Sequence, residues 1–218
     1  MTGHETARTR MVENQLRPNK VTDKRLLDAF LAIHRELFVP EHLRGVAYVD
    51  EDLPLGKGRH LMEPMVAARL LQAAAVERAD TALIVGAGTG YEAALVAVLV
   101  RSVVALEEDL ELARRARAAL VELSIASVSV VEAPLPQGHP ARAPYDVIFF
   151  CGAVAEVTAK IASQLADGGR LMAVVKSGSG MGRATLTTRI VGGLARRALF
   201  DAATPLLPGF FPKPAFAF

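Results

Sequence analysis

Cysteine is nearly absent from this sequence: Cys151 is its only one, so an internal disulfide cannot form. Tryptophan is missing, and aromatic residues make up only 6% of the chain. Lys and Arg number 25 against 23 Asp and Glu, without the basic excess that usually marks a protein gripping a nucleic-acid backbone. We therefore expect no nucleic-acid partner, and no bound metal.

Long hydrophobic runs are also lacking. The longest, residues 93–100, ends at Arg101 and is too short to cross a bilayer. The first residues do not show the charged-then-apolar pattern of a signal peptide. These absences predict a protein with no membrane partner, and by default a cytoplasmic one.

What the sequence does have is a high hydrophobic content, 51% over 218 residues, enough for one large domain spanning residues 1–218. Short apolar runs recur through its second part. They do not alternate with polar residues, which is typical of strands covered on both faces by helices. The runs are residues 82–85, 103–106, 128–131, 147–150 and 171–175.

Between these runs lie helical stretches, most clearly residues 110–123, where apolar residues recur at helical spacing. Near the end, residues 184–191 and 194–202 flank Gly192-Gly193, a hairpin turn signal. The pattern predicts an α/β fold: a doubly wound, mostly parallel, Rossmann-like sheet over residues 81–218, closed by a C-terminal antiparallel hairpin.

Residues 1–80 form the lead-in to this sheet, which we expect to be helical. Thr22 is the predicted N-cap of a helix whose apolar stripe is Leu26, Leu27, Phe30 and Ile33. Prolines and glycines then indicate a loop over residues 40–64, with another helix starting near Pro64.

A glycine loop directly follows the first apolar run. Gly86-Ala87-Gly88-Thr89-Gly90 lets the chain turn sharply and lets its backbone approach a ligand. The dinucleotide pattern G-x-G-x-x-G would need glycine at position 91, where this chain has Tyr91. The spacing G-x-G-x-G suits S-adenosyl-L-methionine instead. The alternative is a tight strand-to-helix turn that binds nothing.

Glu107 ends the second apolar run, within about 20 residues of the loop, where an acidic residue is placed to accept hydrogen bonds from ribose hydroxyls. Alternatively, Glu107, Glu108 and Asp109 simply favour the N-terminus of the next helix. Both can hold, because the ribose needs only one carboxylate.

From about Met11 to Val175 the chain resembles the protein-L-isoaspartate O-methyltransferases. Besides the glycine loop, the resemblance rests on Phe38-Val39-Pro40, Ala47-Tyr48, Leu53-Pro54-Leu55-Gly56-Lys57-Gly58, Ala143-Pro144-Tyr145-Asp146 and Gln164-Leu165-Ala166-Asp167-Gly168-Gly169-Arg170-Leu171. It implies methyl transfer from S-adenosyl-L-methionine to an isoaspartyl carboxylate of a damaged protein or peptide.

The chain departs from the family in the loop that shapes the acceptor site. Where the family has Gln-Thr-Ile-Ser-Gln-Pro, this chain reads Arg59-His60-Leu61-Met62-Glu63-Pro64. A thioether replaces the serine hydroxyl at Met62, and the Glu63 carboxylate would repel an anionic acceptor unless Arg59 or His60 offset it. These four, Arg59, His60, Met62 and Glu63, are the candidate substrate-loop residues.

The family's Gly-Asp-Gly, whose Asp contacts the adenine side, aligns with Ala133-Pro134-Leu135, so Glu132 is the candidate replacement. Three functions stay open: an isoaspartyl methyltransferase, a related enzyme with another acceptor such as a small molecule, and a non-catalytic adenosyl-binding protein. The oligomeric state is left open.

Overall fold

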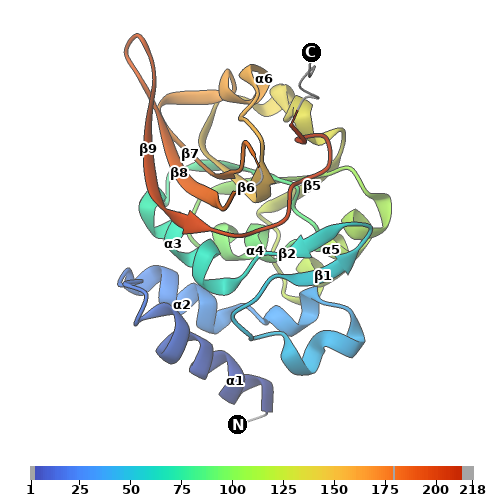
Figure 1. The fold of residues 1–218 in the computed structure, drawn as a ribbon. Helices are drawn as coiled ribbons and strands as arrows, with labels where there is room; N and C mark the ends of the chain where they lie inside the picture. The colour runs from blue at the N-terminus through green and yellow to red at the C-terminus, as the bar shows by residue number, and fades with distance from the viewer. Residues whose placement is uncertain (1–2, 179, 213–218) are drawn as a thin grey trace, which may run out of the picture.

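A seven-stranded sheet with the order β5-β4-β3-β6-β7-β8-β9 forms the centre of the computed structural model, which describes residues 3–178 and 180–212 (Figure 1). Strands β3 to β7 are parallel, and β8 and β9 are antiparallel. This confirms the predicted mostly parallel sheet with a C-terminal hairpin. The strands are β3 (Thr81–Val85), β4 (Ser102–Glu107), β5 (Val128–Glu132), β6 (Tyr145–Val154), β7 (Leu165–Val175), β8 (Gly182–Ile190) and β9 (Gly193–Ala202).

Neighbouring residues of each strand point to opposite faces of the sheet, and a buried hydrophobic core covers each face. Ile84 packs in a core shared with the lead-in, whereas Leu83 packs in a second core with Leu207 and Phe210. The edge strand β5 departs from this pattern and is only partly buried. The helices from Pro64 onward are α3 (Pro64–Ala74), which ends the lead-in, then α4 (Tyr91–Ala97), α5 (Leu110–Glu122) and α6 (Ala159–Ala162), with 3-10 turns at Leu135–Gln137 and Pro140–Arg142.

The lead-in begins with α1 (Gly3–Met11), a π-helical turn (Val12–Leu16) and α2 (Lys24–Ala32), followed by 3-10 turns at Arg35–Phe38 and Glu41–Val46. The predicted apolar stripe of α2 is buried, as expected. The predicted N-cap is wrong by one residue: the Asp23 side chain accepts the Arg25 backbone N–H, whereas the Thr22 N–H donates to Gln72. A carboxylate is the stronger acceptor for the partial positive charge of a helix N-terminus.

A second, two-stranded sheet corrects the predicted loop of residues 40–64. β1 (Leu53–Gly56) pairs antiparallel with β2 (Arg59–Leu61), and their turn contains Gly56, Lys57 and Gly58, all with positive φ. The strands form because alternate side chains, including Leu53, Leu55 and Leu61, are buried. The glycines that the sequence analysis takes as loop signals belong to the turn of this hairpin (Figure 1).

The lead-in and the sheet share one hydrophobic core, in which Leu26 and Phe30 of α2 belong to the same buried cluster as Ile84 of β3. This packing supports a single domain over residues 1–218, which stays a prediction. Within residues 3–178 and 180–212, none of the helices has the length and apolar character needed to cross a membrane.

Candidate cofactor and acceptor site

The glycine loop connects β3 to α4 at the carboxyl edge of the sheet. Gly86, Gly88 and Gly90 all have positive φ, at 73°, 57° and 97°. The Gly86 and Ala87 N–H groups donate to the carbonyl oxygen of Leu106 at 2.9 and 3.0 Å, which ties the loop to β4. A Cβ at Gly88 would lie 3.0 Å from Cδ1 of Leu55. The loop therefore needs glycine both for its conformation and for its neighbours.

The other two predicted loop residues face the lead-in. The Thr89 hydroxyl donates to the carbonyl oxygen of Phe38, and Thr89 is buried. Tyr91 is fully buried and packs edge-on against Phe30 and Phe38. These side chains fix the loop and α4 to the lead-in, so only their backbone can approach a ligand in this conformation.

Glu107 stands at the end of β4, beside the glycine loop, with no exposed surface. Its Oε2 accepts the Gly88 N–H at 2.7 Å, and its Oε1 accepts the N–H groups of Glu108 and Asp109 at 2.9 and 3.0 Å. Asp109, and not Glu107, caps α5 by accepting from Glu111 and Leu112. Asp109 therefore performs the helix-capping role that was the alternative explanation for Glu107.

The same carboxylate is the partner of Arg59, which the sequence analysis places in the acceptor loop. Nη1 of Arg59 lies 2.6 and 2.8 Å from the two Glu107 oxygens, and Nη2 donates to the Gly86 carbonyl oxygen at 2.6 Å. The Arg59 side chain is 3% exposed. The structure thus joins residues predicted for two separate subsites.

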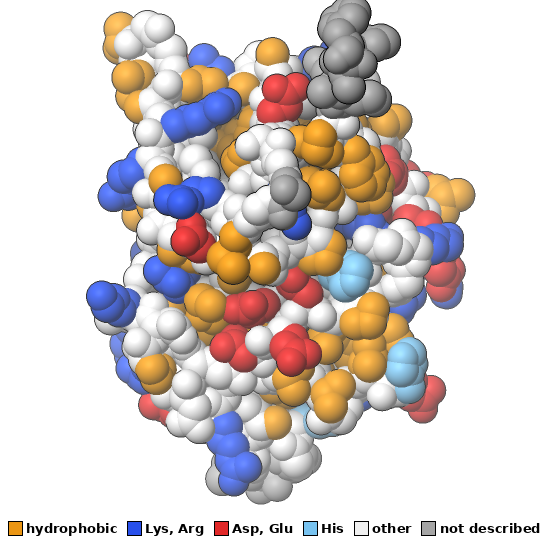
Figure 2. Space-filling model, viewed as in Figure 1, with side chains coloured by type: hydrophobic (Ala, Val, Ile, Leu, Met, Phe, Trp, Pro, Cys, Tyr) orange, Lys and Arg blue, Asp and Glu red, His pale blue; other side chains and the backbone are white. Residues whose placement is uncertain are grey.

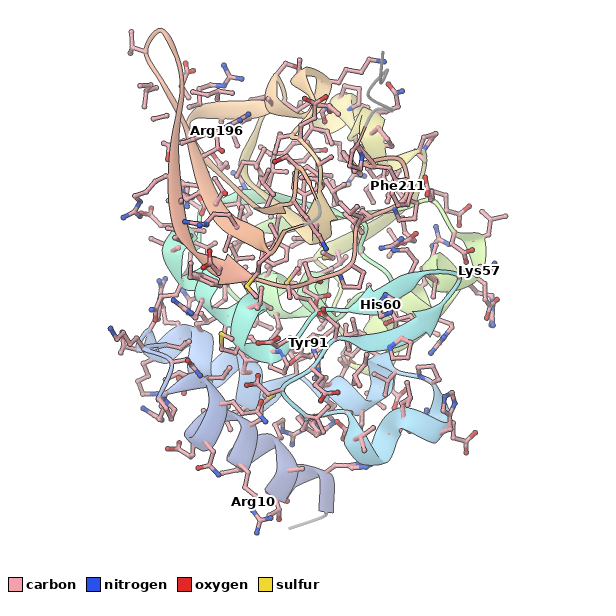
Figure 3. The ribbon with its side chains drawn as sticks, in the orientation of Figure 1. Arg10, Lys57, His60, Tyr91, Arg196 and Phe211 are labelled. Atoms are coloured by element: carbon pink, nitrogen blue, oxygen red, sulfur yellow. The ribbon has the colours of Figure 1, made fainter. Side chains whose placement is uncertain are left out.

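The remaining substrate-loop candidates lie in different surroundings. Met62 is 1% exposed and lies in the main core, so its thioether is not accessible in this conformation; its assignment to the substrate loop stays a prediction. His60 is half-buried on β2, and its Nδ1 has no hydrogen-bond partner within the part of the chain that the structure describes (Figure 3).

Glu63 is half-buried at the start of α3 and lies among acidic neighbours. Burial, and then the negative charges of Asp50, Asp52 and Glu51, raise the pKa of Glu63 to about 7. Figure 2 shows acidic side chains gathered near the centre of this face. The region beside β2 is therefore acidic, as the sequence predicted from Glu63 alone.

Two buried charged groups, Arg35 and Glu92, lie at the start of α4 and are not identified by the sequence analysis. Arg35 donates to the carbonyl oxygens of Ala47 and Met62 at 2.7 and 2.8 Å and lies 4.8 Å from the Tyr91 ring centroid. Glu92 is 1% exposed, and burial raises its pKa. An arginine beside helical apolar residues gave no signal of burial, because its partners are backbone groups that only the fold brings near.

The predicted adenine-side residues follow the end of the edge strand β5, where Glu132 is the register partner of Glu107 on β4. Glu132 is exposed, and its carboxylate pairs with Arg117 of α5 at 2.5 Å. Leu135 is fully buried, and its N–H points to a Glu108 oxygen at 3.4 Å. The assignment of Glu132 to the adenine side stays a prediction, and it would require release of Arg117.

Leu207 is a further site residue that the sequence did not indicate. A Cβ placed on either Gly86 or Gly152 would lie 2.8 Å from Cδ2 of Leu207. The chain after β9 therefore returns to the ends of β3 and β6, where the Leu207 N–H donates to Ala153. Leu207, Leu55 and Arg59 together line the surface of the loop.

These residues fit an adenosyl group in type and placement. A glycine loop that opens a helix, with a carboxylate at the end of the neighbouring parallel strand, is the arrangement that binds a ribose diol in sheets of this kind. In the conformation described, however, Arg59 already occupies both oxygens of that carboxylate.

The fold and the loop define the class: a Rossmann-like methyltransferase, with the antiparallel β8–β9 pair on a parallel sheet. The model of the family "Protein-L-isoaspartate(D-aspartate) O-methyltransferase (PCMT)" matches residues 6–192. The chain belongs to this family, which confirms the resemblance found in the sequence.

The sequences of individual relatives align with most of this chain. The protein-L-isoaspartate O-methyltransferase of Koribacter versatilis is 37% identical over 201 residues, which are 92% of this chain and 90% of that protein. The one of Methanoculleus marisnigri is 39% identical over 168 residues, 77% and 76% of the two chains.

Solved structures show the same fold. A protein-L-isoaspartate O-methyltransferase superposes with a TM-score of 0.82 at 24% identity, covering 94% of this chain and 67% of the other. A Plasmodium falciparum PCMT structure in complex with S-adenosyl-L-homocysteine gives 0.79 at 18% identity, covering 95% and 99%.

Proposed function

We propose that this chain is an S-adenosyl-L-methionine-dependent methyltransferase whose acceptor is the free carboxylate of an isoaspartyl residue in a protein or peptide. The observation that carries the proposal is the pairing of the glycine loop with the buried Glu107 carboxylate at the ends of adjacent parallel strands. Membership of the PCMT family along residues 6–192 supports the acceptor class.

The reaction asks little acid–base chemistry of the protein. When bound, the cofactor supplies an electrophilic methyl group on its sulfonium. A carboxylate acceptor is already ionised at neutral pH, so no strong base is needed. The work of this chain is alignment and exclusion of water. Gly86, Gly88 and Gly90 give the loop the positive-φ conformation in which its backbone can approach the cofactor, Glu107 would bind the ribose, and the β1–β2 hairpin covers the loop.

The test is methyl transfer from labelled S-adenosyl-L-methionine to an isoaspartyl peptide, with the normal aspartyl peptide of the same sequence as control. We expect incorporation into the isoaspartyl peptide alone. Calorimetric titration with S-adenosyl-L-homocysteine on the same preparation establishes cofactor binding separately. No binding at millimolar ligand by the folded protein would refute the proposal.

A second candidate, a related methyltransferase with another acceptor, is favoured by the acidic region around Glu63. A negative region repels an anionic acceptor, and repulsion between partly buried charges is weakly screened.

For an isoaspartyl acceptor, KM should therefore rise between pH 6 and pH 8 as Glu63 ionises, and the rise should be smaller in Glu63→Gln. A cofactor-binding protein that methylates no isoaspartyl peptide at either pH would favour this second function.

A further inference from the structure

The contact between Arg59 and Glu107 has a consequence for how the chain takes up its cofactor. A carboxylate offers about four lone-pair sites. Here the two oxygens of Glu107 accept three backbone N–H groups, and Arg59 donates to both oxygens. Those bonds leave no site for two ribose hydroxyls. Only the Arg59 contacts come from a side chain, so they are the ones that can be exchanged for a ligand without unfolding the loop.

Arg59 is not the only hairpin residue that makes contacts near the glycine loop. It belongs to the β1–β2 hairpin, which also places Leu55 against Gly88. At the hairpin tip, Lys57 pairs with Asp109 at 2.6 Å (Figure 3). Three contacts from one hairpin therefore reach the glycine loop, the end of β4 and the start of α5. A short two-stranded sheet with glycines in its turn can move as a unit while the main sheet stays in place.

The chemistry of the guanidinium makes it a substitute for a ribose diol. Its Nη1 presents donors to the carboxylate, as two vicinal hydroxyls would. Its Nη2 satisfies the Gly86 carbonyl oxygen at 2.6 Å. Because Arg59 is 3% exposed, solvent does not weaken these bonds. A cofactor must break them before it can form its own.

We propose that Arg59 is an internal competitor of the cofactor: it closes the ribose subsite by binding Glu107, and the cofactor binds only after the β1–β2 hairpin carries Arg59 away. This rests on the proposed function. In such a scheme the apparent Kd equals the intrinsic Kd divided by the fraction of molecules with the subsite open. Arg59 therefore sets the affinity for the cofactor without contacting the reacting atoms.

The experiment compares S-adenosyl-L-homocysteine binding by the unmodified protein, Arg59→Gln and Arg59→Lys. Glutamine cannot bridge Glu107 and Gly86, and in this variant Glu107 keeps its three backbone donors. We expect the Kd of Arg59→Gln to be at least tenfold lower than that of the unmodified protein. Arg59→Lys keeps the charge, which protects the fold if glutamine does not, and should fall between the two.

Arg170→Gln is the matched control, because Arg170 is another well-packed arginine, paired with Asp80 at 2.5 Å, near the start of β3. We expect its affinity for S-adenosyl-L-homocysteine to equal that of the unmodified protein. Urea unfolding of every variant separates lost affinity from lost structure.

Binding kinetics give a second readout. In stopped-flow mixing, opening of the hairpin should appear in the unmodified protein as a phase whose rate stops rising with ligand concentration. That phase should be absent in Arg59→Gln. Equal or weaker binding by folded Arg59→Gln would overturn the competitor role and leave the proposed function intact. Failure of all the proteins to bind would overturn the proposed function, and the competitor role with it.

Discussion

At position 107, a carboxylate without exposed surface receives hydrogen bonds from the glycine loop, from the residues that start α5 and from Arg59. Charged groups are rarely buried unless they are paired and hydrogen-bonded, and Glu107 is both. Removing one partner of such a pair costs more than the pair contributes, because the other charge is left buried.

Glu107→Gln should therefore lower the affinity for S-adenosyl-L-homocysteine at least tenfold, because the ribose loses a charged acceptor. It should also reduce the free energy of unfolding by about 3–5 kcal/mol, since Arg59 is left unpaired. Calorimetry and urea unfolding measure the two effects. Glu111→Gln on α5, which removes an exposed carboxylate, is the control. Unchanged affinity in a folded Glu107→Gln protein would show that Glu107 is structural only.

The raised pKa of Glu63 predicts that the stability of the folded protein depends on pH. Its pKa rises from an ordinary 4.5 to about 7 in the folded protein, chiefly by burial. The folded state thus holds this proton more tightly than the unfolded state, so its contribution to stability is full below about pH 4.5 and is lost as the pH rises through about 7. Urea unfolding at pH 5 and pH 8 should show a smaller loss of stability in Glu63→Gln than in the unmodified protein. The same loss in both proteins would contradict the assignment.

At the scale of elements, the glycine loop and the β1–β2 hairpin depend on each other. The loop needs positive φ at three positions, and the hairpin lies close enough that a side chain at Gly88 would meet Leu55. The strand ends bring the loop and Glu107 together, and the hairpin then determines which space remains for a ligand.

Gly88→Ala should abolish S-adenosyl-L-homocysteine binding and lower the free energy of unfolding by about 1–2 kcal/mol, because alanine is strained at φ 57° and its Cβ would lie 3.0 Å from Leu55. Gly168→Ala is the matched control: Gly168 has φ 73° but no atom within 4 Å of an added Cβ. It should show a similar loss of stability with unchanged affinity. Calorimetric titration of both variants with S-adenosyl-L-homocysteine measures these affinities. Normal binding by Gly88→Ala would count against a ligand site at this loop.

For the whole molecule, the lead-in and the sheet meet at the ring contact of Phe30 with Tyr91, whose centroids are 6.3 Å apart. Phe38 and the guanidinium of Arg35 pack on the same Tyr91 ring. Since Tyr91 opens α4, the lead-in supports the helix that begins at the glycine loop.

Phe30→Ala should cost about 3–5 kcal/mol of unfolding free energy, the usual range for a buried phenylalanine. If residues 1–218 form one domain, the whole chain should still unfold in a single step, with coincident transitions by circular dichroism and by tyrosine fluorescence. Leu31→Ala on the same helix is the control, because Leu31 is 36% exposed. Two separate transitions, with only the first shifted in Phe30→Ala, would divide the lead-in from the sheet.

Much of the fold was predictable from local pattern. Buried parallel strands are continuous apolar runs, and the runs at residues 82–85 and 103–106 lie inside β3 and β4. The β1–β2 hairpin was not predicted. Its two strands are short, and prolines and glycines around them carry the signal of a loop as well as that of a turn.

The parallel sheet, the glycine loop and the acidic residue at the end of β4 could be predicted from the order of residues alone, because periodicity and local backbone requirements depend on neighbouring residues. The contact of Arg59 with Glu107 arises only in the folded chain, since the two residues are far apart in sequence and meet through the hairpin. The same holds for the burial of Met62 in the core and for the position of Leu207 over Gly86. These contacts depend on which surfaces the fold brings together, and a buried ion pair forms only where both charges lose their water at the same place.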